Sequence, residues 1–311
     1  MVSICVPSYR KPTYVVRLLD ALLKQTQQDI EVVITDDSPD DSVKIAIEPY
    51  KNQLNIQYFH NVPALGSPMN WNKAISLARG EYFMLMHQDD WFHDPQAIDI
   101  FLNAFKSNPQ AEFVFCKNTA QQPDGRYVVL QAIPSLPYQL KQYPNRLALA
   151  QVIGPPSNVM LKTAVRDKVT YDDRFIWFVD VDYNARLIKE GFDYVYIDRH
   201  LVTIGLHKDQ TTEFVGENLD IKFRENIWFA AKIGKEAFLD WKLYDYYWRL
   251  LRNFNVRTEE DFKSNKLSIQ EIPAVLLHMF SLQKRIPSGL LQIGVLSKIF
   301  MFLNFITWKS R

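Results

Sequence analysis

The first 117 residues alternate between two hydrophobic periods, and this alternation restricts the fold more than any other feature of the chain. Short apolar runs such as VSICVPS (2–8) and EYFMLMH (81–87) are typical of buried strands. The segments between such runs repeat apolar residues at helical spacing, as TYVVRLLDALLKQT (13–26) does. The predicted strands cover 2–8, 30–37, 55–61, 81–87 and 111–117, and the predicted helices cover 13–26, 41–53, 67–80 and 94–109. This alternation predicts an α/β fold, with a mostly parallel sheet covered by helices on both faces.

The pattern changes twice after this part of the chain. Residues 118–216 are less regular, and from 217 onward the sequence is helical and rich in aromatic residues. We therefore predict an α/β domain over 1–216 and a C-terminal helical region over 217–311. The elements expected between these parts are strands at 127–133, 193–198 and 200–207, a loop entering a strand at 153–162, and a helix at 179–191.

The composition excludes several classes of protein. The 311 residues carry a net charge of +1, which gives no reason to expect a nucleic-acid partner. Cys5 and Cys116 lie in apolar runs and are expected in the core, so no disulfide framework is predicted. The apolar run at the N-terminus is too short for a signal peptide, and no uncharged apolar run reaches the roughly 18 residues of a membrane-spanning helix. A cytoplasmic location is expected.

Acidic residues follow the strands at the positions where ligands bind to open parallel sheets. Asp36 and Asp37 follow the second strand, and Asp89 and Asp90 follow the fourth. A further cluster begins at Asp180, near the start of the helix predicted at 179–191. Each cluster alone is also compatible with a turn or a helix cap.

Two adjacent carboxylates repel each other, and a divalent cation relieves that repulsion. Mg²⁺ and Mn²⁺ bind one or two carboxylates together with water and phosphate oxygens, so QDDWF (88–92) predicts a cation that meets a diphosphate. The chain contains no GxGxxG after the first strand and no GxxxxGK[ST], GxSxG or HExxH motif. Dehydrogenases, P-loop enzymes, hydrolases of the GxSxG type and HExxH zinc proteases are therefore disfavoured.

Taken in order, several segments resemble the family 2 inverting glycosyltransferases, which have the GT-A fold. They are VSICVPSYRKPTYVVRLLDALLKQT, EVVITDDSPDDS, NWNKAISLARGEYFMLMHQDDWF, GPPSNVM and FVDVDYNARLIKEG. The resemblance covers about residues 1–215. It implies that about 1–117 bind the nucleotide sugar and that about 118–216 bind the acceptor.

The resemblance assigns the donor side of the site. It implies that Pro7, Ser8 and Tyr9 cradle the base and ribose. It also implies that Asp37 accepts the base imide N–H, with Asp36 beside it. The family's Asp-x-Asp metal motif corresponds here to Gln88-Asp89-Asp90, a DXD-like motif with a glutamine in the first position. Asp90 is expected to bind the metal directly, and Asp89 to contact the sugar or act in the second sphere.

The catalytic base of the family usually lies in a Glu-Asp pair at the start of a helix. Here the pair reads Val179-Asp180, so the glutamate is absent and the resemblance assigns the base to Asp180. It also suggests His207 as a ligand of the metal or the diphosphate. The residues expected on the acceptor side are Gly154, Pro155, Pro156 and Trp177.

The implied reaction moves a sugar from a nucleotide-diphosphate donor to a hydroxyl group, with Mn²⁺ or Mg²⁺ as cofactor. A UDP- or dTDP-sugar is expected as donor, and a lipid-linked glycan or polysaccharide as acceptor, as in O-antigen (lipopolysaccharide) or capsule synthesis. Two alternatives remain open. A nucleotidyltransferase would normally have a glycine-rich basic loop after the first strand, and VPSYRKPTY has no glycine. A catalytically idle sugar-nucleotide-binding scaffold would explain the missing glutamate beside Asp180.

The end of the chain is apolar and basic. Residues 272–311 contain five basic residues and no acidic one, and Gly294, Ser297, Lys298 and Asn304 fall along one helical side. One interpretation is an interfacial helix within 286–311, bound peripherally to the inner face of the cell membrane. The other is a helix packed on the α/β domain or on another subunit of a homo-oligomer.

Overall fold

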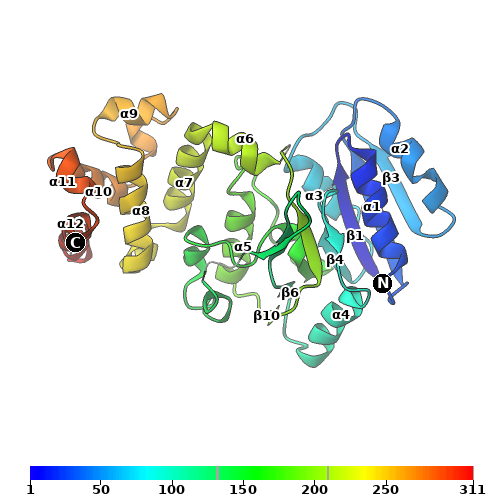
Figure 1. Ribbon diagram of the computed structural model, residues 1–311. Coiled ribbons are helices and arrows are strands. Elements are labelled where there is room, and N and C mark those ends of the chain that lie inside the picture. Colours follow the sequence, from blue (N-terminus) through cyan, green and yellow to red (C-terminus); the bar gives the residue numbers. More distant parts are fainter. Residues whose placement is uncertain (131–132, 209, 311) are drawn as a thin grey trace. The chain divides into compact units, whose positions relative to one another are not determined.

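The computed structural model describes residues 1–130, 133–208 and 210–310, and the chain divides into two compact units (Figure 1). The sheet unit is Met1–Gln210 and the helical unit is Thr211–Arg311. Arg311, one of the basic residues noted above, lies outside the described residues. The assignment of a catalytic role to 1–216 stays a prediction.

The main sheet of the sheet unit has seven strands among the described residues, in the order β10-β6-β9-β4-β1-β2-β3. All neighbours pair in parallel except those of β9, which runs antiparallel between β4 and β6. This arrangement confirms the predicted mostly parallel sheet. The strands are β1 (Val2–Ser8), β2 (Ile30–Asp36), β3 (Asn55–His60), β4 (Tyr82–Leu85), β6 (Phe113–Cys116), β9 (Val159–Lys162) and β10 (Tyr194–Ile197).

The register brings the ends of four strands to one edge of the sheet. Ser8 at the end of β1 is level with Asp36 at the end of β2, and Asp36 is level with His60 at the end of β3. Leu85 at the end of β4 pairs with Cys5 of β1. Because β9 runs the opposite way, its first residue, Val159, lies at this same edge. We call it the carboxyl edge.

Helices cover both faces of the sheet. Val2, Ile4 and Val6 of β1 point into a core shared with α1, α2 and α4, whereas Cys5 alternates to the other face. The helix α3 packs against β1, β2 and β4. The α-helices of the sheet unit are α1 (Pro12–Leu23), α2 (Ser42–Ile47), α3 (Met69–Ser76), α4 (Ala97–Ser107) and α5 (Val179–Lys189). Its 3₁₀ helices are η1 (Glu48–Tyr50), η2 (Leu136–Tyr138), η3 (Pro144–Ala148), η4 (Pro156–Asn158) and η5 (Thr163–Val165).

A second sheet lies beyond β4 in the sequence, and the hydrophobic pattern predicted only two of its strands, at 127–133 and 200–207, where β8 and β11 are found. Over the described residues it has the order β5-β11-β7-β8, with strands of two to four residues. Such short strands give little periodicity to recognise. The strands are β5 (Trp91–Phe92), β7 (Thr119–Gln121), β8 (Tyr127–Val129) and β11 (Val202–Gly205). The strand predicted at 127–133 thus begins as β8, and its residues 131–132 lie outside the described part.

The helical unit is built from short helices rather than one long one. The region 217–254, predicted as helical, contains α7, η6 and α8, and Asp240 caps α8 by accepting a hydrogen bond from the Lys242 N–H (3.0 Å). Within the residues described, no helix combines the length and apolar character needed to cross a bilayer. The elements are α6 (Thr211–Glu217), α7 (Leu219–Ile233), η6 (Lys235–Leu239), α8 (Trp241–Asn253), α9 (Glu259–Ser264), η7 (Ile269–Glu271), α10 (Ala274–Gln283), α11 (Ser288–Gln292) and α12 (Gly294–Lys309).

Candidate active site

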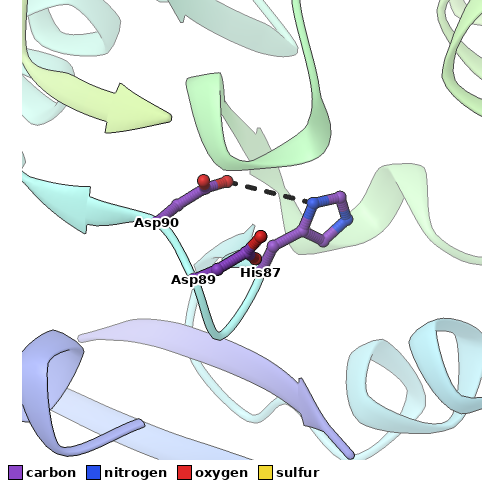
Figure 2. A group of neighbouring side chains, drawn as sticks. All are labelled: His87, Asp89 and Asp90. Atoms are coloured by element: carbon purple, nitrogen blue, oxygen red, sulfur yellow. Dashed lines mark ion pairs between the residues drawn. The ribbon is translucent and has the colours of Figure 1, made fainter. Parts of the chain in front are cut away.

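The segment after β4 turns sharply at the carboxyl edge and presents two acids. The His87 N–H donates a hydrogen bond to Ser157 Oγ (2.9 Å), which lies just before β9. The Asp90 N–H then donates to the His87 carbonyl (3.1 Å), closing a tight turn. Figure 2 shows His87, Asp89 and Asp90 side by side at this turn. Ser157 of η4 (Pro156–Asn158), directly before β9, therefore supplies a contact that fixes the acidic loop.

Asp90 is buried, and one of its carboxylate oxygens has no hydrogen-bond partner among the described residues. Asp90 is only 1% exposed, and its Oδ1 accepts a hydrogen bond from the Gly205 N–H (3.1 Å). Its Oδ2 lies 3.9 Å from His87 Nδ1, and no hydrogen-bond partner for Oδ2 occurs among the described residues. Burial raises the pKa of Asp90 well above its usual range, and the neighbouring charge of Asp89 raises it further. The folded chain thus holds a carboxylate in a place that disfavours its charge.

Asp89 has the opposite environment. Its Oδ2 lies 2.7 Å from Nε2 of His207, and its main-chain oxygen accepts a hydrogen bond from the Arg17 guanidinium. Burial alone would raise the pKa of Asp89. The hydrogen bond with His207 is the largest effect that opposes burial, and the pKa of Asp89 lies below its usual value. Asp89 is therefore the acid of the pair that keeps its charge.

These residues fit a divalent cation. His87, Asp89 and Asp90 each offer a ligand atom, and these atoms lie within 4.8 Å of one another. Burial lowers the pKa of His87, which keeps its imidazole neutral and able to bind a metal. The buried Oδ2 of Asp90 is an oxygen ligand that no hydrogen bond within the described chain occupies. His207, expected as a ligand, contacts Asp89 and lies outside this group of three, so its role stays a prediction.

Two residues that support the acidic loop were missed by the sequence reasoning. The Arg17 guanidinium on α1 stacks 4.0 Å from the centre of the Trp91 ring and holds the Asp89 carbonyl. A Cβ atom at Gly205 would overlap that same carbonyl, so this position on β11 accepts only glycine. The signal for Gly205 was available, because an isolated glycine inside a strand pattern often marks close backbone approach.

The side chains of Ser8 and Asp36 are used inside the fold. Ser8 is 1% exposed and donates from its hydroxyl to Asp36 Oδ1 (3.0 Å). Asp36 is fully buried and also accepts hydrogen bonds from the Ser38 hydroxyl (2.6 Å) and the Tyr58 hydroxyl (2.8 Å). Pro7 is buried in β1. These side chains brace the ends of three strands inside the fold.

Asp37 organises the loop that follows β3. Its Oδ1 accepts hydrogen bonds from the Asn61 side chain (2.7 Å) and the Leu65 N–H (3.0 Å), and its Oδ2 accepts one from the Gly66 N–H (2.8 Å). The residue is 6% exposed. A carboxylate has about four acceptor positions, so one remains on Oδ2.

Tyr9 and Gln88 join the loop after β1 to the acidic loop. The Tyr9 N–H donates to Gln88 Oε1 (3.2 Å), and the Gln88 amide donates to the Tyr9 carbonyl (3.1 Å). Only an amide side chain can both accept and donate in this way. The Tyr9 side chain itself is 49% exposed. The glutamine at the first position of the DXD-like motif is therefore a link between two loops.

The residues expected on the acceptor side lie in the turn before β9 and near the start of α5. Gly154 has φ of 84°, and a Cβ atom there would overlap the Asn158 side chain, so glycine is required. Pro155 and Pro156 lead into η4, which ends next to β9. Trp177 is half-buried, with its ring centre 5.5 Å from that of Phe178.

Asp180 lies in the first turn of α5 and is half-buried. A row of aromatic rings connects its helix to the acidic loop. The tilted rings of His87 and Trp71 have centres 4.7 Å apart, and Trp71 meets Tyr171 edge-on at 5.2 Å. Tyr171 in turn stacks on Tyr183 at 4.0 Å, three residues after Asp180. Burial raises the pKa of Tyr171, and the charges of Tyr183 and Asp180 add to the effect.

Comparison with known proteins identifies the family and the fold. Residues 3–170 match Glycosyl transferase family 2. Chondroitin synthase of Escherichia coli is 32% identical over 130 residues, which are 41% of this chain and 18% of that protein, so the match spans under a fifth of the relative. The whole chain is also similar in fold to solved structures.

Staphylococcus aureus TarS 1–349, solved in complex with UDP-GlcNAc, has a TM-score of 0.59 and 17% identity. The match covers 99% of this chain and 90% of that one. The mannosyltransferase PcManGT of Pyrobaculum calidifontis, solved with GDP-Man and Mn²⁺, has a TM-score of 0.56 and 15% identity, over 99% of this chain and 86% of that one. Both likenesses concern the GT-A fold. On the family match over more than half of its length, the chain belongs to glycosyl transferase family 2.

Proposed function

We propose that the protein is a metal-dependent inverting glycosyltransferase that moves a sugar from a nucleotide-diphosphate donor to a hydroxyl group. One observation carries the proposal: the buried Oδ2 of Asp90, which lacks a hydrogen bond within the described residues, lies beside the ionised Asp89 at the carboxyl edge. Ligands of open parallel sheets bind at that edge. The family membership and the nucleotide sugars named for TarS and PcManGT support the same donor class.

Asp90 and Asp89, with His87, are the residues that would hold Mn²⁺ or Mg²⁺. When bound, the cation would supply positive charge for the departing diphosphate. The Mn²⁺ named for PcManGT supports this cofactor class. His207, through its hydrogen bond to Asp89, would keep that acid ionised and oriented. The remaining support comes from Arg17, which fixes the main chain at Asp89.

On the donor side, the main chain of Pro7, Ser8 and Tyr9 would line the base and ribose. Asp37 would receive the imide N–H of a uracil or thymine base on its remaining acceptor position, which suits a UDP- or dTDP-sugar. Asp36 would act indirectly, because its buried carboxylate holds Ser8 and Ser38 in place.

On the acceptor side, Asp180 would act as the general base. It takes the proton of the acceptor hydroxyl while that oxygen bonds to the anomeric carbon and the carbon–oxygen bond to the diphosphate breaks, inverting the configuration. Gly154, Pro155, Pro156 and Trp177 would line the acceptor. A lipid-linked glycan or polysaccharide of the O-antigen or capsule type, made in the cytoplasm, is the proposed acceptor. The polymer named for the Escherichia coli relative supports a glycan acceptor.

The test is a panel of sugar nucleotides, each with Mn²⁺, with Mg²⁺ or with EDTA. Thermal stabilisation reports donor binding, and release of the nucleoside diphosphate in the presence of glycan acceptors reports turnover. We expect one donor to stabilise the protein only with cation and to be turned over with inversion, as read from the anomeric NMR signal of the product. Binding without turnover for every acceptor would favour the idle scaffold. Turnover that is unaffected by EDTA would contradict the metal role.

A further inference from the structure

The helix α12 faces its polar side toward the interior of the helical unit. Ser297 and Asn304 are only 1% and 4% exposed. Ser297 Oγ accepts hydrogen bonds from the Trp248 indole (3.0 Å) and from Arg252 (3.2 Å). Asn304 Oδ1 accepts one from the Tyr244 hydroxyl (2.6 Å). The polar residues Ser297 and Asn304 noted in the sequence thus form hydrogen bonds inside the helical unit.

The outward side of α12 is apolar, which reverses the usual arrangement of a surface helix. At about 100° per residue, positions 295, 299, 302, 303 and 306 fall within about 100° of one another around the helix. The last turns before α12 add two more exposed side chains. We call these seven residues the apolar face: Leu290 (42% exposed), Ile293 (49%), Val295 (73%), Ile299 (50%), Phe302 (51%), Leu303 (55%) and Ile306 (51%). An exposed patch of this kind marks an interaction site.

The surroundings of the apolar face are basic. Between Ile272 and Ser310 the sequence has four basic residues and no acidic one. The four, all exposed, are Lys284, Arg285, Lys298 and Lys309. Lys298 and Lys309 flank the apolar face on one side of α12. Lys298 also pairs with Asp245 (3.0 Å), an acid of α8 that is 9% exposed. Asp245 therefore displays little of its negative charge at this surface.

We propose that the apolar face lies on an anionic lipid surface, with α12 parallel to the membrane plane. Apolar side chains at the acyl boundary together with lysines at the headgroups are what such a surface binds. A second copy of the chain fits less well, because a symmetric contact would bring the same basic residues of both copies together. The helix α12 has 16 residues and would reach about 24 Å, which is less than the roughly 30 Å of a bilayer core. We therefore place α12 on the membrane surface rather than across it. This inference is independent of the proposed reaction.

The test measures binding of the whole protein to vesicles by flotation. We expect binding to phosphatidylcholine vesicles that contain phosphatidylglycerol, and weak binding to phosphatidylcholine alone. The double variant Phe302→Gln, Ile306→Gln should bind the anionic vesicles at least about tenfold more weakly, because it removes apolar area from the boundary. Lys309→Gln should weaken binding about fivefold, and added salt should reduce that difference.

Leu219→Gln is the matched control, since Leu219 is 54% exposed on α7 and lies outside the apolar face. All three variants should keep the circular dichroism and donor binding of the parent chain. Equal binding of parent and double variant, or no binding of the parent, would overturn the proposal. If the double variant instead converts a dimer to a monomer in light scattering, the apolar face joins two copies and the lipid assignment is wrong.

Discussion

At the carboxyl edge of the sheet unit, the buried Asp90 keeps one carboxylate oxygen without a hydrogen bond within the described chain. In the helical unit, the buried Ser297 and Asn304 of α12 are hydrogen-bonded by Trp248 and Tyr244. An unsatisfied buried group costs stability, and a satisfied one does not. Under the proposed function, the buried carboxylate of Asp90 would serve a ligand, whereas the buried polar groups of Ser297 and Asn304 serve internal packing. In the helical unit, the surface left for a partner is apolar.

The substitution Asp90→Asn should have the largest effect and should separate activity from stability. It removes a carboxyl group whose charge is disfavoured by burial, so the melting temperature without cation should stay level or rise. Turnover should fall on the order of 10³- to 10⁵-fold, because charge on the leaving diphosphate would lose several kcal/mol of stabilisation. Melting curves with and without Mn²⁺ and donor, together with initial rates, would measure both effects.

Asp173→Asn, which changes an exposed acid of the same unit, is the control and should leave both quantities unchanged. If Asp90→Asn lowered stability and kept the response to Mn²⁺, the carboxylate would be structural, and the contrast between the two units would disappear.

Asp180→Asn should lower kcat by about 10²- to 10⁴-fold, as expected when a general base is removed. Asparagine is close in size and cannot take the proton, so the donor affinity should not change. Steady-state rates with varied donor and acceptor would separate kcat from KM. A variant with the parent kcat would remove Asp180 from the site and leave the carboxyl edge with its acidic pair alone.

Ser297→Ala tests the other side of the comparison. The Trp248 indole and Arg252 would lose their acceptor, which should destabilise the fold by about 1–3 kcal/mol. Turnover and donor affinity below the melting temperature should match the parent. Urea unfolding is the measurement, with Ser310→Ala as control because Ser310 is exposed at the end of α12. A fall in donor affinity would mean that the two units are coupled.

The smallest expected effect is a loss of folding stability at low pH, caused by protonation of His200 beside the second sheet. The rings of His93 and His200 stack at 3.9 Å, and burial, together with the charge of His93, lowers the pKa of His200 to about 4. The unfolded chain takes up this proton near pH 6.5, so stability is full above that pH and is lost as the pH falls toward 4. The loss should reach about 1–2 kcal/mol after allowance for solvent screening. Unfolding of the parent and of His200→Gln at pH 7 and pH 4.5 would measure it, and equal acid sensitivity in both would contradict the assignment.

The main sheet could be predicted because its strands are apolar runs separated by helical periods, and that signal is local. The second sheet could be predicted only in part. Its strands β8 and β11 fall in the predicted segments 127–133 and 200–207, but β5 has two residues and pairs with β11 across more than 100 positions of sequence. The same long-range pairing brings Gly205 and His207 to Asp90 and Asp89. Nothing local in the sequence marks Ser157 as the residue that holds His87.

In the helical unit, the sequence predicted the polar stripe of α12, but it did not predict whether that stripe faces the interior or the solvent. Periodicity identifies the two sides of a helix, and only packing decides which side is inside. A polar stripe that faces inward needs hydrogen-bond partners such as Trp248 and Tyr244 on α8. These partners cannot be predicted from the local sequence pattern of α12.

The amide link between Gln88 and Tyr9 has an electrostatic consequence. An acid at position 88 would meet the Tyr9 carbonyl with a lone pair and would add a third negative charge beside Asp89 and Asp90. The neutral side chain fastens two loops and keeps the local count at two acids. A cation attracted by fewer protein charges relies more on the oxygens of its other ligands, so its affinity should rise when a diphosphate arrives with it. Metal and donor would then bind to this site cooperatively, each raising the affinity for the other, without a fixed order of binding.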